Sequence, residues 1–166
     1  MSIGLERWRS LKGRMTKIMK ASAIAIQLIK GLEGWSPTPY KDGGGKCTLG
    51  WGHLVEEGEV CPDRISAEQG EQYLADDVAD AEFAVRSTVN VPLKQHQFDA
   101  LVSFLFNVGP TAWAKSDTLK ILNDGQYHRV PARLMMWDKI TKNGVKVEDE
   151  GLINRRLKEV RLWLGW

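Results

Sequence analysis

The sequence predicts an α+β fold, in which a small antiparallel sheet is joined by a long helix to a larger helical lobe. Residues 40–61 combine strand-favouring side chains with many glycines, which is typical of short strands and tight turns. Residues 66–86 carry a helix-start signal followed by helical periodicity, and the pattern is again helical from residue 92. With 43% apolar and 27% charged residues among 166, the chain has the composition of a folded domain, which excludes a wholly disordered protein.

The N-terminal part divides into an extension and the start of a folded domain. Residues 1–20 are basic and are interpreted as an extension, whereas residues 21–166 are predicted to form a single domain with two lobes. A helix is predicted from residue 21, and Pro37 and Pro39 prevent its continuation beyond Gly34. Its apolar stripe recurs at helical spacing and consists of Ala21, Ile24, Ala25, Leu28, Ile29 and Leu32.

The middle of the chain holds the predicted sheet and the connecting helix. Residues 40–61 are predicted to be the one β region of the chain. Ser66 and Gln69 have the spacing of a capping box, which opens a helix that reaches about Arg86. The side chains expected to be buried along this helix are Tyr73, Leu74, Val78, Ala81 and Val85.

The C-terminal half is predicted to be mainly helical. A nearly all-apolar helix from Pro92 belongs in the centre of the core and ends at Gly109. Further helices are expected over residues 116–123, with Ser116 as cap, and around 128–138, and Asn143-Gly144 marks a turn or small hairpin. A last helix begins near Gly151, and its inward side chains are predicted to be Leu152, Leu157, Val160, Trp163 and Leu164.

Charge, apolar runs and cysteines restrict the possible functions. Residues 1–30 carry seven cations against one acid, and residues 56–82 carry ten acids against one cation, although the net charge is only +2. Basic ends suit an anionic partner such as nucleic acid, a membrane surface or cell wall, but solvated helix faces explain them equally well. No apolar run is long enough for a transmembrane segment and no secretory signal is recognisable, so we expect a soluble chain that is not exported by itself. Cys47 and Cys61 could be bonded or reduced, and the three histidines lack metal-ligand spacing, so no metal site is predicted.

The segment from Glu33 to Thr48 contains the residues most suited to chemistry. Glu33 ends an apolar helix, where burial would favour the protonated form of its carboxyl group, and Asp42 lies in a glycine-rich, more polar stretch. One carboxyl group in an apolar niche and another in a wetter place are the two environments that glycoside hydrolysis requires. The spacing alone does not distinguish a catalytic pair from a glutamate and an aspartate that lie near a turn by chance.

Three ordered blocks of sequence resemble the bacteriophage lysozymes of glycoside hydrolase family 24. The first is Glu33-Gly34, then Pro39-Tyr40-Lys41-Asp42, then Thr48-Leu49-Gly50-Trp51-Gly52-His53, which is similar to the active-site segment of that family. The second is Phe106-Asn107-Val108-Gly109, and the third is Gly151-Leu152-Ile153-Asn154-Arg155-Arg156 followed by Glu159. The resemblance covers residues 21–165 and implies a lysozyme-like fold.

The resemblance implies a glycoside hydrolase of the lysozyme type (EC 3.2.1.17). Its substrate would be the β-1,4 bond between N-acetylmuramic acid and N-acetylglucosamine in peptidoglycan. Glu33 would be the general acid, and Asp42 and Thr48 would position or activate water, in a reaction that the family carries out with inversion. Two carboxyl groups and a water suffice for this chemistry, so no cofactor is expected.

The resemblance also assigns roles around these three residues. Leu54, Phe106 and Thr118 fall at substrate-contact positions. Asn107 is expected to bind substrate as well, because a polar residue at the end of so apolar a helix should face the cleft, although it could instead cap that helix. His53 is expected to be structural, in a contact between the sheet and the helical lobe. Arg155 matches an arginine that lies near the catalytic glutamate, and its competing reading is an ordinary cation of a C-terminal helix.

A monomeric, bacteriolytic phage or prophage endolysin is the biological role that the resemblance implies. Such an enzyme would accumulate in the host cytoplasm and would need a holin to reach the peptidoglycan in the periplasm during cytolysis. Residues 1–20 could alternatively be a membrane-surface or secretion element. The rival functions are a non-catalytic peptidoglycan-binding protein on the same fold and a nucleic-acid binder, for which the sequence holds no base-reading motif.

Overall fold

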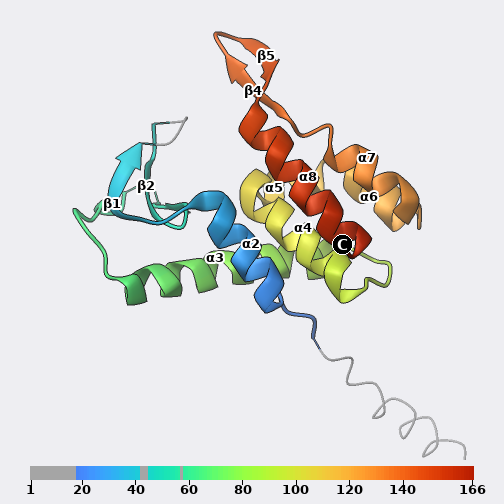
Figure 1. The fold of residues 1–166 in the computed structure, drawn as a ribbon, viewed down its shortest axis with the longest axis horizontal. Coiled ribbons are helices and arrows are strands. Elements are labelled where there is room, and N and C mark those ends of the chain that lie inside the picture. Colours follow the sequence, from blue (N-terminus) through green and yellow to red (C-terminus); the bar gives the residue numbers. More distant parts are fainter. Residues whose placement is uncertain (1–17, 42–44, 57) are drawn as a thin grey trace, which may run out of the picture.

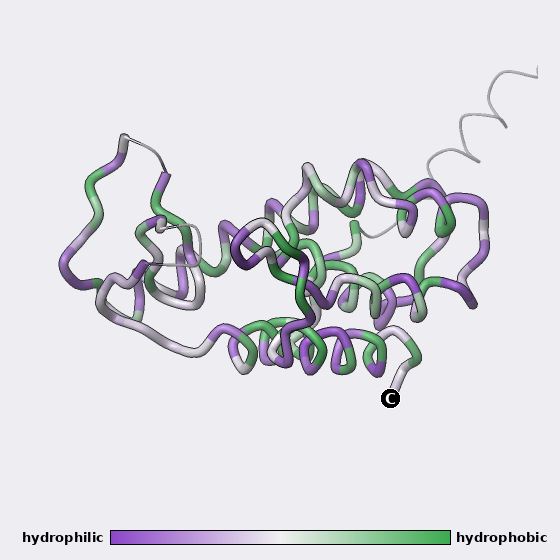
Figure 2. Tube along the Cα trace, turned by 90° about the horizontal axis from the view of Figure 1, so that it is seen from above, coloured by the Kyte–Doolittle hydropathy of each residue, from purple (hydrophilic) through white to green (hydrophobic). Residues whose placement is uncertain are grey.

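The computed structural model describes residues 18–41, 45–56 and 58–166, and it confirms the α+β fold (Figure 1). A sheet lobe lies at one end of the molecule and a helical lobe at the other (Figures 1 and 2). Helix α3 contacts both lobes. The helices are α2 (Ala23–Glu33), α3 (Ala67–Thr88), α4 (Gln95–Val108), α5 (Pro110–Ala114), α6 (Asp117–Asn123), the 3-10 turn η1 (Tyr127–Arg129), α7 (Val130–Leu134) and α8 (Glu150–Leu164). The strands are β1 (Ser36–Lys41), β2 (Cys47–Gly50), β3 (His53–Leu54), β4 (Lys139–Lys142) and β5 (Val145–Glu148). Within the described residues, no helix is both long and apolar enough to cross a bilayer.

The sheet lobe is an antiparallel β1-β2-β3 meander in which Thr48 of β2 pairs with Tyr40 of β1 and Leu54 of β3. Its first strand begins at Ser36, four residues before the predicted sheet. From the sequence, Pro37 and Pro39 were expected only to stop a helix. Both lie in β1, an outer strand of the sheet, where a residue without an N–H group can be accommodated.

Helix α3 begins and packs as the sequence predicts. Ser66 and Gln69 form the reciprocal capping box, with Gln69 N donating to Ser66 Oγ and Ser66 N donating to Gln69 Oε1. Of the five side chains in the predicted stripe, Tyr73 is only half-buried, while the other four are buried. The same face also holds the buried Glu82, whose carboxylate accepts a hydrogen bond from the backbone of Ala21 and so ties the start of the domain to α3.

Helix α4 is the central helix of the core. Phe98, Leu101, Val102, Phe104 and Leu105 are all buried, and α2, α3 and α8 pack around them. The helix ends at Gly109, which has a φ of 78° that favours glycine. The predicted helix over residues 116–123 is also present as α6, with Ser116 as its cap.

The predicted apolar faces of two helices are wrong at three positions. Ile24 of α2 is exposed, and so are Leu157 and Leu164 of α8. The inward face of α8 instead holds Arg155, Arg156 and Glu159 together with Leu162 and Trp163. The apolar pattern predicts the wrong inward face because charged side chains of opposite sign pair with one another in the interior.

The prediction of one β region is also wrong. Strands β4 and β5 form a second antiparallel pair, which projects from the helical lobe before α8 (Figure 1). Its turn lies at Asn143 and Gly144, the position at which the sequence marked a turn or small hairpin. Both residues have positive φ, as the tight turn of a two-residue hairpin requires.

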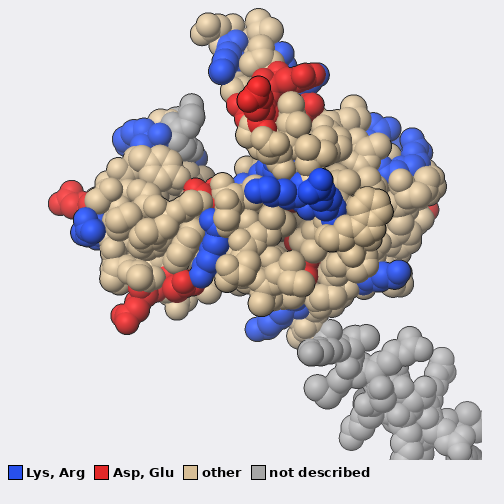
Figure 3. All heavy atoms as spheres, in the orientation of Figure 1, with Lys and Arg blue, Asp and Glu red and all other residues tan. Residues whose placement is uncertain are grey.

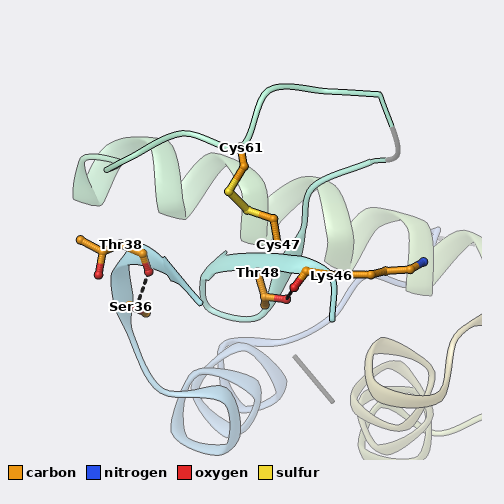
Figure 4. Close-up of a disulfide and its surroundings, with 6 residues drawn as sticks. All are labelled: Ser36, Thr38, Lys46, Cys47, Thr48 and Cys61. Atoms are coloured by element: carbon orange, nitrogen blue, oxygen red, sulfur yellow. Dashed lines mark hydrogen bonds between the residues drawn. A yellow bond between two sulfur atoms is a disulfide. The ribbon is translucent and has the colours of Figure 1, made fainter. Parts of the chain in front are cut away.

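Cys47 and Cys61 form a disulfide, which settles the alternative that the sequence left open. Their Cα atoms are 6.2 Å apart and 14 positions separate them in the sequence. Figure 4 shows that Cys47 and its neighbour Thr48 point to opposite faces of β2. The bond therefore ties the loop before α3 to the outer face of the strand that carries Thr48.

Reduction of this disulfide should lower the free energy of unfolding by about 3 kcal/mol, the value expected for closing a loop of this length. Thermal unfolding with and without reductant measures the effect. A Cys47→Ser/Cys61→Ser variant should unfold near the temperature of the reduced wild type and should not respond to reductant. An unchanged melting temperature of the wild type on full reduction would contradict this expectation.

Candidate active site

Glu33 is the last residue of α2 and lies against the turn between β2 and β3. Its side chain is 19% exposed. The turn passes so close that a Cβ atom built on Gly52 would lie 2.8 Å from Glu33 Oε2, and Gly52 also has a φ of 80°. The positive φ favours glycine, and a larger residue here would also push the Glu33 carboxylate away. The glycine-rich motif thus allows the sheet lobe to enclose the Glu33 carboxylate.

Arg155 of α8 holds Glu33 from the side of the helical lobe. Arg155 Nη1 lies 2.5 Å from Glu33 Oε1, and Arg155 is only 5% exposed. Its Nη2 donates to the backbone oxygen of Ser103 at 3.2 Å, and its Nε donates to Glu159 Oε1 at 3.1 Å. Such a buried and fully engaged guanidinium is not an ordinary surface cation of a C-terminal helix.

Of the other two residues in the predicted triad, the structure describes only Thr48. Thr48 is buried in the middle of β2, and its hydroxyl donates to the backbone oxygen of Lys46 at 3.4 Å (Figure 4). Asp42 lies outside the described residues. The predicted Glu33–Asp42–Thr48 triad therefore stays a prediction.

His53 joins the sheet lobe to α3. Its Nδ1 lies 3.0 Å from Asp77 Oδ2, and its ring stacks on Tyr73 with centroids 4.2 Å apart. Burial raises the pKa of Asp77, while the hydrogen bond and charge of His53 act in the opposite direction. These contacts fit the structural role expected for this histidine.

The predicted substrate-contact residues fall into two groups. Leu54 is exposed and Phe106 half-buried, and both line a small cavity with His53 between the sheet and the end of α4. The surface has a notch between the sheet lobe and the β4–β5 hairpin (Figure 3). Thr118, in contrast, is 2% exposed on α6, so its burial gives no support to a contact with substrate.

Asn107 lies near the end of α4, and its side chain is engaged by α8. Its Oδ1 accepts a hydrogen bond from Arg156 Nη2 at 2.6 Å, while the helix end is closed by the Gly109 N–H bonding to the oxygen of Leu105. The competing interpretation of Asn107 as a helix cap is thus not supported. Asn107 is exposed and lines a cavity of about 540 Å³ together with Trp137 and the hairpin.

Arg156 and Glu159 are both fully buried, and the sequence predicted no role for either residue. Arg156 Nε lies 3.1 Å from Glu159 Oε2, and Ser103 Oγ donates to Glu159 Oε1 at 3.0 Å. Burial raises the pKa of Glu159, although both arginines and Ser103 oppose this. Burial also lowers the pKa of Arg156 to about 10, against the charge of Glu159. The spacing Arg-Arg-x-x-Glu on one helix is the signal that could have indicated this cluster.

Comparison with known proteins decides the family. The family model described as phage lysozyme matches residues 30–159. The chain belongs to the phage lysozyme family. The matched range includes Glu33, Thr48 and Arg155, and its helices and sheet are those of a lysozyme-like fold.

Relatives within this family are similar over most of the chain. An endolysin of Acyrthosiphon pisum secondary endosymbiont phage 1 is 38% identical over 147 residues, which is 87% of this chain and 98% of the relative. The endolysin of Salmonella phage P22 is 35% identical over 151 residues, which is 89% of this chain and all of the relative.

Solved structures of related proteins have the same fold. An endolysin from Escherichia coli O157:H7 phage FAHEc1 is similar with a TM-score of 0.80 and 37% sequence identity, and the match covers 88% of this chain and 94% of that endolysin chain. The muramidase domain of SpmX from Asticcacaulis excentricus also has a TM-score of 0.80, at 34% sequence identity. The match covers 88% of this chain and 98% of the SpmX domain. The chain is therefore a lysozyme of the phage type by family, sequence and fold.

Proposed function

We propose that this phage-type lysozyme is a muramidase that hydrolyses the β-1,4 bond between N-acetylmuramic acid and N-acetylglucosamine in peptidoglycan. The observation that carries the proposal is the position of Glu33, at the junction of the two lobes, enclosed by the Gly52 turn and paired with Arg155. The relatives named as endolysins and the muramidase domain of SpmX support the same substrate.

Glu33 is assigned the role of general acid. Its Oε1 is engaged by Arg155, so Oε2, on the side of the Gly52 turn, is assigned the proton. Transfer of this proton to the glycosidic oxygen lets the C1–O bond break, while a water attacks C1 and loses its proton to Asp42. The Thr48 hydroxyl, which can donate and accept, helps to orient that water.

Delivery and assembly form a second part of the proposal. The enzyme would act as a monomer in the periplasm after a holin opens the inner membrane, and no cofactor takes part in its reaction. The observation behind the alternative route is the basic composition of residues 1–20. Export of a periplasmic reporter fused to residues 1–30 would overturn the holin requirement. A mass of twice the monomer in sedimentation equilibrium would overturn the proposed monomeric state.

Incubation with purified sacculi separates the enzyme from a non-catalytic binding protein. The wild type should release soluble fragments with new reducing ends, whereas Glu33→Gln should sediment with the sacculi and release none. Glu150→Gln, which changes an exposed glutamate in the first turn of α8, is the matched control and should behave as the wild type. Binding by the wild type without new reducing ends would favour the non-catalytic alternative.

Arg155→Met should lower the rate of peptidoglycan hydrolysis, because it removes the side chain that holds Glu33 Oε1 from the side of the helical lobe. Initial rates on soluble peptidoglycan fragments measure the effect, with thermal unfolding as a check of folding. An unchanged rate in a folded variant would contradict a role of Arg155 in positioning Glu33.

A further inference from the structure

One buried carboxylate links two residues of the proposed site. Glu159 Oε1 accepts from Arg155 Nε, and Glu159 Oε2 lies 3.1 Å from Arg156 Nε. The far end of Arg155 reaches Glu33, and the far end of Arg156 reaches Asn107. The Arg155–Glu33 contact positions the proposed acid, whereas the Arg156–Asn107 contact has no part in the proposed hydrolysis step.

The hydrogen bond from Arg156 fixes which end of the Asn107 carboxamide faces outward. Arginine carries only donors, so the Asn107 atom 2.6 Å from Arg156 Nη2 is the oxygen, an acceptor. The amide nitrogen with its two N–H groups then points away from Arg156. Because Asn107 is exposed and lines the cavity beside Trp137 and Lys139, these N–H groups are available to a ligand.

Arg156 can keep this orientation because it is itself immobilised. It is 0% exposed, its guanidinium lies over the ring of Phe104 at 4.7 Å, and its Nε lies 3.1 Å from Glu159 Oε2 in an ion pair. A side chain held by an ion pair and an aromatic face loses little further entropy when it orients a neighbour.

We propose that Arg156 is a positioning residue, which together with Glu159 locks the Asn107 carboxamide so that its N–H groups bind an acceptor oxygen of the glycan strand. This inference rests on the proposed function. The sugars of peptidoglycan carry such acceptors in their acetamido carbonyl groups. Without Arg156 the amide could turn over and present its own oxygen, which repels these groups.

A double-mutant cycle on Arg156 and Asn107 tests the inference. Arg156→Lys keeps a positive charge for Glu159 but loses the planar fork that reaches Asn107 as well. Arg156→Lys and Asn107→Ala should each raise KM for soluble peptidoglycan fragments about three- to tenfold, the range of one neutral hydrogen bond, with kcat little changed. The double variant should be no worse than Asn107→Ala alone.

A purely structural Arg156 predicts a different result. Arg156→Lys would then change KM by the same factor with and without Asn107, or not at all, and either outcome overturns the inference. If the wild type hydrolyses nothing, the proposed function fails first. If the wild type is active and the two effects multiply, only the role of Arg156 fails.

Asn107→Asp provides a test that does not depend on the folding of an Arg156 variant. The aspartate keeps an oxygen for Arg156 and adds a favourable charge, but it has no N–H group. We expect a melting temperature at or above that of the wild type together with at least a tenfold higher KM. An unchanged KM would overturn the inference.

Discussion

Glu33→Gln should reduce the rate of peptidoglycan hydrolysis by about 10²- to 10⁴-fold, the usual contribution of a general acid. Glutamine has the shape of glutamate, and its Oε1 can still accept the hydrogen bond from Arg155, so the junction of the two lobes should stay intact. It has no acidic proton to give to the leaving oxygen. The loss should therefore appear in kcat and not in the fold.

Initial rates on soluble fragments, with circular dichroism and thermal unfolding as checks of folding, measure this effect. Glu150→Gln again serves as the control for the loss of one negative charge and should retain the wild-type rate. A Glu33→Gln variant within a few-fold of the wild type would remove Glu33 from the mechanism.

Glu159→Leu should destabilise the protein by about 3–5 kcal/mol, because it leaves two buried arginines without their shared carboxylate. Glu159 is completely buried and also accepts from Ser103, so leucine removes three interactions and offers none in return. Chemical denaturation followed by circular dichroism gives the free energy of unfolding.

A surface carboxylate is the matched comparison for Glu159. Glu59→Gln changes an exposed side chain in the loop before α3 and should alter stability by no more than about 0.5 kcal/mol. A Glu159→Leu protein as stable as Glu59→Gln would show that the cluster is replaceable by apolar packing, as happens for some buried ion pairs.

The elements that sequence predicts well are those specified by local chemistry. The capping box at Ser66, the cap at Ser116 and the apolar helix α4 each depend on residues a few positions apart. Local patterns are less informative where the partner is distant. The arginines of α8 pair with Glu159 on their own helix, which their spacing allows. They also meet Glu33 from α2 and Asn107 from α4, which no periodicity reveals.

The candidate site divides in the same way. Spacing and resemblance indicated Glu33, Thr48 and Arg155, but the reason for Gly52 is its close approach to Glu33, and that appears only in three dimensions. Resemblance alone indicated Thr118, whose side chain is buried on α6 because local packing decides its exposure. Its contact with substrate stays a prediction.

The identity of the sugar left at the reducing end is the most direct test of the central claim. Sacculi digested by the wild type are reduced with borohydride, and mass spectrometry then identifies the terminal sugar alcohol. Hydrolysis with water positioned by Asp42 and Thr48 predicts fragments that end in reduced N-acetylmuramic acid. Fragments that end in reduced N-acetylglucosamine, or in 1,6-anhydro-N-acetylmuramic acid, would contradict this claim.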